Sequence, residues 1–201
     1  CVMTLTGHTS RIRVVVFSPN GRMLATGSED QTVRLWDITS GECLRSFKGY
    51  NSRVWSATYN HDGELIAGGG DDSIANIWQS NTGDLVRRIP QFNQIRWLTF
   101  HPDGRLLAVA SEDNSIELFN VDTGTSFGTL RGHTARARTA VFNPADKNQI
   151  LTGGDDQVLR LWNINSRSFV RIYRGHTGWI RSVSFSSDGL LAASGAEDGS
   201  A

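Results

Sequence analysis

One phrase returns along this chain at a nearly constant interval. It reads LATGSEDQTVRLWD at residues 24–37 and comes back as LIAGGGDDSIANIWQ, LAVASEDNSIELFN and LTGGDDQVLRLWN. The aromatic residues that close it, Trp36, Trp78, Phe119 and Trp162, are 42, 41 and 43 residues apart. A final copy, LAASGAEDGSA, ends before its aromatic residue. Because a fixed period of this length is the signature of stacked structural repeats, the whole chain is predicted to be a repeat array.

Each period contains four short apolar runs, which in the first copy are residues 11–17, 22–28, 32–38 and 42–47. The runs are rich in β-branched and aromatic residues and show no helical stripe, so they predict strands. Dipeptides typical of hairpin turns follow the first run of four copies: Asn20-Gly21, Asp62-Gly63, Asp103-Gly104 and Asp188-Gly189. The fourth copy has a loop at residues 145–148 that is one residue longer. Four antiparallel strands per period are therefore expected, in an all-β fold.

Three Gly-His pairs and one Trp-Asp pair carry a family resemblance: Gly7-His8, Gly132-His133, Gly175-His176 and Trp36-Asp37. With them the chain resembles the WD-repeat family of β-propellers. The resemblance implies one propeller segment of four-stranded blades, with repeats at about 1–48, 49–89, 90–131, 132–174 and 175–201. It also implies that Val2–Leu5 is an outer strand of a preceding blade. The resulting nineteen strands do not divide into complete blades, so we expect a segment of a larger ring of about seven blades or more.

The resemblance also implies buried hydrogen-bonded tetrads, complete in two blades and partial in a third. Their members are His8, Thr26, Asp30 and Trp36; His133, Thr152, Asp156 and Trp162; and His176, Ser194 and Asp198. A hydroxyl, an imidazole and a carboxylate also suggest a catalytic triad. We interpret them as structural instead, because the set repeats from blade to blade and because a buried carboxylate needs such donors.

The second and third blades depart from this pattern. Tyr50 and Gln91 replace the histidine, and Gly68 and Val109 replace the hydroxyl residue. Two further differences are that Phe119-Asn120 replaces Trp-Asp, and that Asp72 and Asp113 are left to accept turn N–H groups. We interpret the departures as drift, the alternative being a surface reshaped for a partner. Drift predicts faster amide exchange in these two blades than in the first and fourth.

Two positions near the start of each inner strand form the candidate docking site. The outer positions hold Arg11, Arg53, Gln94, Arg136 and Trp179, and the inner positions hold Arg13, Trp55, Arg96, Arg138 and Arg181. In the family these positions lie near the mouth of the propeller channel. Arg and Trp are frequent interface hot spots, so a peptide or protein is expected to dock there, anchored by the inner positions.

An ion-pair belt is the alternative explanation for these arginines. An acidic pair falls at the same end of every blade: Glu29-Asp30, Asp71-Asp72, Glu112-Asp113, Asp155-Asp156 and Glu197-Asp198. Exposed ion pairs of this kind contribute only about 0–1 kcal/mol each. The whole chain carries twenty basic and twenty acidic residues, which argues against a broad electrostatic surface for nucleic acid.

The sequence thus predicts a non-catalytic interaction scaffold or sensor, acting in cytoplasmic signalling as part of a longer polypeptide or a multiprotein complex. Phosphate or nucleic-acid binding through the arginines is the second hypothesis. No cofactor or metal is expected, since no cluster has metal-ligand spacing, and no apolar run approaches the ~20 residues that span a membrane. The remaining histidines, His61 and His101, are expected to be exposed at turns.

Overall fold

The computed structural model describes residues 3–201, and in that range it contains strands and turns but no helix. Its strands form four antiparallel sheets of four strands and one sheet of two strands. This confirms the predicted all-β fold with four strands per period. Each sheet is called a blade below, and the blades are numbered first to fifth in chain order. Within residues 3–201, no helix is present that could cross a membrane.

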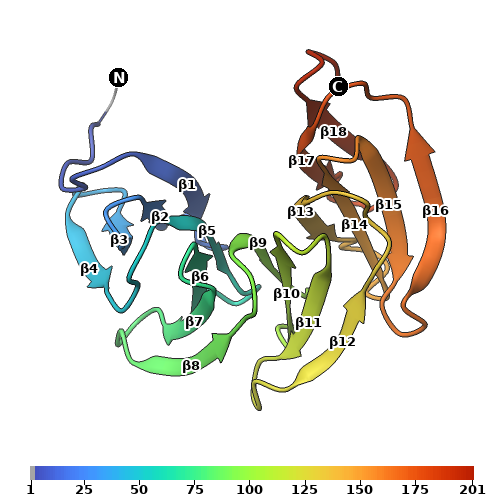
Figure 1. Ribbon diagram of the computed structural model, residues 1–201. Helices are drawn as coiled ribbons and strands as arrows, with labels where there is room; N and C mark the ends of the chain where they lie inside the picture. The colour runs from blue at the N-terminus through green and yellow to red at the C-terminus, as the bar shows by residue number, and fades with distance from the viewer. Residues whose placement is uncertain (1–2) are drawn as a thin grey trace. The chain divides into compact units, whose positions relative to one another are not determined.

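The first compact unit extends to Ile95 and contains the first two blades (Figure 1). The strands of the first blade are β1 (Ile12–Phe17), β2 (Met23–Ser28), β3 (Val33–Asp37) and β4 (Cys43–Phe47). Those of the second are β5 (Val54–Tyr59), β6 (Leu65–Gly70), β7 (Ile74–Gln79) and β8 (Leu85–Pro90). In both blades each strand pairs with the next one along the chain, as expected when short turns join all the strands.

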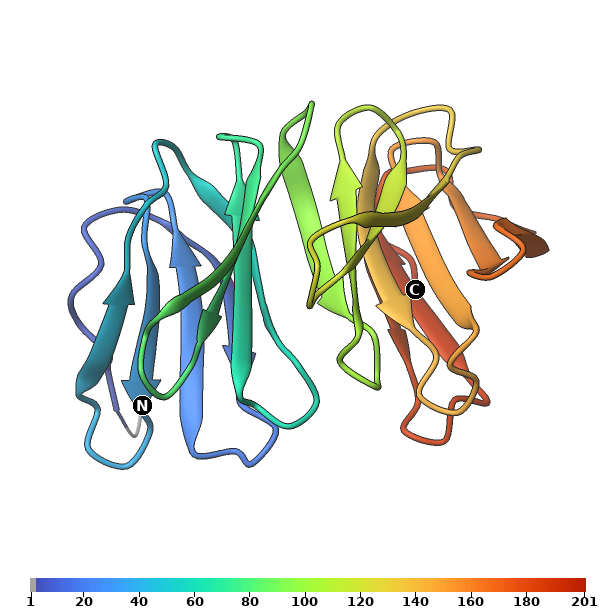
Figure 2. The ribbon, with the colours of Figure 1, turned by 90° about the horizontal axis from the view of Figure 1, so that it is seen from below.

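The second compact unit begins at Arg96 and contains the other three blades. The third blade is formed by β9 (Ile95–Phe100), β10 (Leu106–Ser111), β11 (Ile116–Asn120) and β12 (Ser126–Leu130). The fourth is formed by β13 (Ala137–Phe142), β14 (Gln149–Gly154), β15 (Val158–Asn163) and β16 (Ser168–Arg174). The fifth consists of β17 (Ile180–Phe185) and β18 (Ala192–Ala196). Figure 2 shows the strands of each blade running alongside one another.

The turns lie where the sequence predicted them, but one predicted strand is not assigned. The four hairpin glycines, at positions 21, 63, 104 and 189, all have positive φ, which confirms the hairpin prediction. The fourth blade has the expected longer loop, between Phe142 and Gln149. The outer strand expected at Val2–Leu5 is not assigned: Val2 lies outside the described residues, and Met3–Leu5 are irregular in the structure.

Apolar side chains of neighbouring blades form the core of each unit. In the first unit, Leu35 and Ile66 are fully buried in a cluster that joins the first and second blades. In the second unit, Leu118 and Trp162 belong to a cluster shared by the third and fourth blades. There the Trp97 indole N–H also donates to the carbonyl of Ala140, across 2.8 Å. Strands that are buried on both sides read as apolar runs, which explains β10, LLAVAS, where every residue is buried.

Tyr50 and Gly68 replace the histidine and the hydroxyl residue of the second blade as a matched pair. The Tyr50 ring is 5% exposed and meets Trp78 edge-on at a centroid distance of 5.5 Å. Its hydroxyl occupies the space that a β-carbon on Gly68 would need. Burial raises the pKa of Tyr50 well above its usual value, as expected for a phenol in the core. The larger ring therefore requires the glycine, and the two departures compensate each other.

This compensation predicts a strong coupling between the two positions. We expect Gly68→Ala to reduce the free energy of unfolding by about 2 kcal/mol, because the added methyl group overpacks the core against Tyr50. In a Tyr50→His background the same change should cost less, since the clash with the phenol hydroxyl is gone and only the Val33 methyl group remains in close contact. Urea unfolding of the four proteins of this double-mutant cycle measures the coupling. Additive costs would show that the two positions are independent.

Candidate functional site

The second residue of each acidic pair is an aspartate, and this aspartate stabilises the turn that follows the second strand. In every blade one of its carboxylate oxygens accepts the backbone N–H two residues further on, at 2.9–3.4 Å. The residue between them has positive φ in all five turns: Gln31, Ser73, Asn114, Gln157 and Gly199. Four of these five residues are not glycine, so the residue types gave no signal for positive φ. The aspartate stabilises this conformation by forming an Asx turn. For Asp72 and Asp113 this bonding confirms the sequence-based expectation.

The two predicted tetrads are formed in the first and fourth blades. In the first, His8 Nδ1 is 2.7 Å from Asp30, His8 Nε2 is 2.6 Å from Thr26 Oγ1, and the Trp36 indole N–H donates to the same hydroxyl oxygen. The fourth blade repeats this arrangement with closely similar distances. A neutral histidine that donates to the carboxylate and accepts from the hydroxyl satisfies all four groups.

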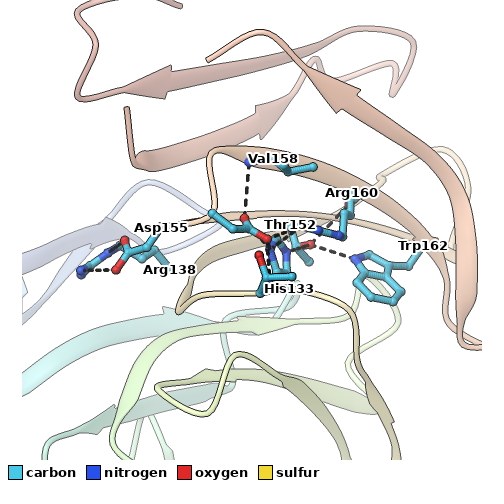
Figure 3. Close-up of polar contacts among 9 residues, drawn as sticks. His133, Arg138, Thr152, Asp155, Val158, Arg160 and Trp162 are labelled. Atoms are coloured by element: carbon cyan, nitrogen blue, oxygen red, sulfur yellow. Dashed lines mark hydrogen bonds and ion pairs between the residues drawn. The ribbon is translucent and has the colours of Figure 1, made fainter. Parts of the chain in front are cut away.

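Arg160 extends the tetrad of the fourth blade. Its guanidinium lies 2.6 Å from the Asp156 carboxylate and also contacts His133 (Figure 3). Burial works to raise the pKa of Asp156, but the hydrogen bonds from His133, Thr134 and Arg160 outweigh it and lower the pKa to about 2. The His133 side chain is fully buried, and that of Asp156 is 3% exposed. This triad-like set therefore has no access to a substrate, which supports a structural role.

The fifth blade has the same polar set without an indole. His176 lies 3.0 Å from Asp198 and 2.8 Å from Ser194. The side chains of His176 and Asp198 are slightly more exposed than their counterparts, at 12% and 11%. The structure thus brings together every predicted tetrad residue of the first, fourth and fifth blades.

The first acid of each pair contacts the inner position of the same blade. Arg13 bonds to Glu29, Arg96 to Glu112, Arg138 to Asp155 and Arg181 to Glu197, and the Trp55 indole donates to Asp71 across 2.6 Å. Figure 3 shows the Arg138–Asp155 pair separated from the tetrad. The hydrogen bonds from Arg13 lower the pKa of Glu29. The ion pairs that the sequence left as an alternative therefore form in four of the five blades, one of them in the first unit and three in the second.

A β-bulge directs these inner side chains toward the acids. The pairing of first and second strands skips one residue in four blades, and the skipped residue is the inner one: Arg13, Trp55, Arg138 and Arg181. A bulge leaves one residue without a partner in the ladder and re-aims its side chain. The sequence showed these residues but no signal of the bulge.

The outer positions differ from the inner ones. The backbone carbonyls of Arg11, Arg53, Arg136 and Trp179 accept the N–H of the first acid, which fixes the chain, while their side chains are exposed. Within residues 3–201, Arg11 and Arg53 attract Glu29 only at longer range, while Arg13 bonds to it directly. Arg136 approaches Glu112 only to 3.5 Å, and Arg96 already binds that carboxylate. The outer arginines therefore keep unused donors.

Tryptophans on this end of the blades contact arginines of the adjacent blade and, for Trp179, of its own blade. The Arg13 guanidinium lies 4.4 Å from the ring centre of Trp55. In the second unit, Arg138 and Arg181 both contact Trp179, at 5.2 and 5.1 Å. Trp179 remains 42% exposed. Its ring is held at a fixed position and is still accessible.

His101 was predicted to be exposed, and this is wrong. The residue is 5% exposed, because it packs edge-on against Phe142 and bonds to the longer loop of the fourth blade. His61, in contrast, is exposed as expected. No group of three His, Cys, Asp or Glu side chains that could hold a metal ion occurs in the described part of the chain.

Comparison with known families identifies the class of protein. The model of the WD domain, G-beta repeat, matches residues 1–37, 41–79, 124–163 and 167–201. The model of the anaphase-promoting complex subunit 4 WD40 domain matches residues 91–143. The chain belongs to the WD-repeat family, and its four-stranded sheets are blades of a partial β-propeller. Proteins of this family generally mediate protein–protein interactions.

Several named relatives are similar to parts of the chain. THO complex subunit 3 of Arabidopsis thaliana is 36% identical over 154 residues, which cover 77% of this chain and 35% of the relative. Protein tipD of Dictyostelium discoideum is 28% identical over 152 residues, 76% of this chain and 18% of the relative. Nuclear distribution protein nudF 2 of Penicillium rubens is 47% identical over 47 residues, 23% of this chain and 10% of the relative. The matched segments thus span about a third or less of these relatives, and none of the three names denotes an enzyme.

The tetrads predict that stability is lost in acid. The folded-state pKa of Asp156, about 2, lies below the ordinary 3.8, so the ionised carboxylate stabilises the fold above about pH 4. This contribution should disappear as the pH falls from about 4 to about 2. Asp156→Asn should therefore be much less stable than the wild type at pH 7, and the difference should shrink toward pH 2.

Urea unfolding between pH 7 and pH 2.5 measures this difference. Asp84→Asn, at an exposed turn, is the matched control and should follow the wild type at every pH. A difference between Asp156→Asn and the wild type that stays constant across this range would contradict the assignment.

Proposed function

We propose that this chain is a non-catalytic docking module, which binds a protein or peptide at the blade ends that carry the outer positions. The observation that carries the proposal is the difference in side-chain contacts between the inner and the outer positions. The inner side chains are engaged by acids of their own blades, whereas Arg11, Arg53 and Arg136 keep donors to spare.

The contact chemistry of the second unit supports a protein partner. Trp179 offers an exposed aromatic surface that two guanidinium groups contact. Arg136, the outer residue of the preceding blade, has a side chain that is 49% exposed. Interfaces are enriched in Trp and Arg anchors of this kind, and a rigid anchor loses little entropy on binding. The inner arginines act here as supports that hold the tryptophan, rather than as the anchors that the sequence favoured.

The charge balance at these ends disfavours a nucleic-acid surface. In the first unit the acids Glu29 and Asp71 lie among Arg11, Arg13 and Arg53, so little net charge remains. Binding to a phosphate backbone would require several uncommitted cations and would weaken steeply with salt. Family members named as complex subunits, such as THO complex subunit 3, are consistent with a role in an assembly.

Substitutions at the outer positions should weaken partner binding without unfolding the protein. We expect Trp179→Ala and Arg136→Ala each to weaken binding at least tenfold, as truncation of an interface anchor does. Arg22→Ala removes the same charge at the opposite end of the first blade and should leave binding unchanged. Quantitative affinity capture from cell extract, followed by titration of the purified partner, measures the effect.

The outcome distinguishes the two functional hypotheses. Retention of the partner by both Trp179→Ala and Arg136→Ala would refute docking at these positions. A bound partner that proves to be nucleic acid, with affinity falling steeply between 50 and 200 mM salt, would favour the phosphate-binding alternative.

A further inference from the structure

Phe92 is a fully exposed aromatic side chain in the loop that leads to one of the outer docking positions. It is the most exposed large apolar side chain among residues 3–201. The loop, residues 91–94, joins β8 to β9 and ends at Gln94, the outer position of the third blade. Exposure of this ring gives up the favourable burial of a large apolar surface. Single exposed apolar residues are common on proteins, so the location of Phe92 carries more weight than its exposure alone.

The other blades have a small polar residue at the position of Phe92. This position directly follows the histidine of the tetrad or its replacement, and elsewhere it holds Thr9, Asn51, Thr134 and Thr177. In all four of these residues the backbone N–H donates to the aspartate of the turn, at 2.7–3.3 Å. Phe92 therefore places an apolar ring where the repeat places a hydroxyl group or an amide.

The two ends of the loop are held in place. The backbone N–H of Gln91 donates to the carbonyl of Ser73 across 2.7 Å, and the Gln91 side-chain amide donates to the carbonyl of Pro90 across 3.1 Å. At the other end of the loop, Ile95 is fully buried. Phe92 thus extends into solvent from a short loop with fixed ends. Because its side chain has only two rotatable bonds, the ring loses little conformational entropy when it binds.

Ser73 connects this loop to the docking end of the second blade. It follows Asp71 and Asp72 in the turn after β6, and the Asp71 N–H donates to the carbonyl of Arg53 across 3.0 Å. Phe92 therefore lies at the same end of the second blade as Arg53, whose side chain is exposed. An exposed aromatic ring and an exposed guanidinium group thus occur together at one end of the first unit.

The shape and charge of this end indicate the class of partner. A ring that extends into solvent is desolvated only when the partner supplies a concave apolar surface, which a folded protein has and a short extended peptide lacks. The exposed Arg11 and Arg53 favour carboxylates beside that surface, because a guanidinium group binds a carboxylate through two parallel hydrogen bonds. A nucleic acid would stack a base on Phe92, but Glu29 and Asp71 at this end would repel its phosphates.

We propose that Phe92 is an apolar anchor of the docking end, which inserts into a pocket of a folded partner protein, and that acidic side chains around this pocket bind Arg11 and Arg53. Phe92 thereby adds an anchor and a partner class to the same docking end, so this assignment rests on the proposed function. For the loop of the third blade it favours the alternative that the sequence left open, a surface reshaped for a partner.

Photo-crosslinking of the intact polypeptide tests the pocket. The photoreactive residue p-benzoylphenylalanine replaces Phe92 in one protein and, in a control, Leu85, which is 54% exposed on β8. Irradiation in cell extract, followed by mass spectrometry, identifies the residues to which each position attaches. We expect position 92 to attach to one protein, at residues that line an apolar pocket with acidic neighbours. Position 85 should not attach to that protein.

Titration of the crosslinked protein, purified, with matched variants completes the test. We expect Phe92→Ala to weaken binding at least tenfold, as truncation of an interface anchor does. Phe92→Leu should weaken binding less, because the smaller side chain still fills part of the pocket. Leu85→Ala should bind like the wild type. Urea unfolding should be the same for all three variants as for the wild type, since both side chains are exposed.

The outcomes separate this anchor from the proposed function. Wild-type affinity of Phe92→Ala for a partner that Trp179→Ala releases would overturn the anchor and leave the proposed function in place. A complex of that partner without a crosslink at position 92, or attachment of position 92 to nucleic acid, would overturn the anchor as well. Unchanged binding by Phe92→Ala, Trp179→Ala and Arg136→Ala together would refute both.

Discussion

An aspartate in the turn between the second and third strands is the constraint on which each blade depends. Its carboxylate accepts the N–H two residues further on, which allows residues such as Gln31 and Gln157 to adopt positive φ. The same carboxylate then has an oxygen available for the histidine of the tetrad. One side chain therefore sets the turn, orients the imidazole and, through Thr26 or Thr152, positions the indole. Its charge is tolerated because several donors surround it.

The residue before this aspartate performs a different task on the surface. Because it precedes the turn, its carboxylate lies at the end of the blade and meets the bulged residue of the first strand. This pairing neutralises the inner arginines and fixes tryptophans between blades. At the outer positions, the backbone carbonyls of Arg11, Arg53, Arg136 and Trp179 accept the N–H of the first acid, while their side chains are exposed. Ion pairs and exposed side chains thus coexist on neighbouring residues at the start of the same strands.

The departures in the second blade show that packing of an aromatic ring can replace the hydrogen-bonded tetrad. Tyr50 fills the space of the histidine and of the hydroxyl group together, and Gly68 makes room for it. Such a coupled change keeps the core packed while removing a buried carboxylate–imidazole bond. The interpretation of these departures as drift is compatible with this, provided that the two changes are considered as one. In the third blade Asp113 keeps its turn bonds to Ser115.

The sequence by itself determined the period, the four strands of each blade and the hairpin glycines, because these depend on local propensity and on spacing within one repeat. The members of the tetrads followed from the resemblance to the WD-repeat family. Tertiary structure decided the rest. The bulge at Arg13, the exposure of Arg11 and the burial of His101 follow from contacts between residues 16 to 46 positions apart, in different strands or blades. No local pattern encodes such contacts. For that reason the sequence placed His101 in solvent, whereas packing between the third and fourth blades buries it.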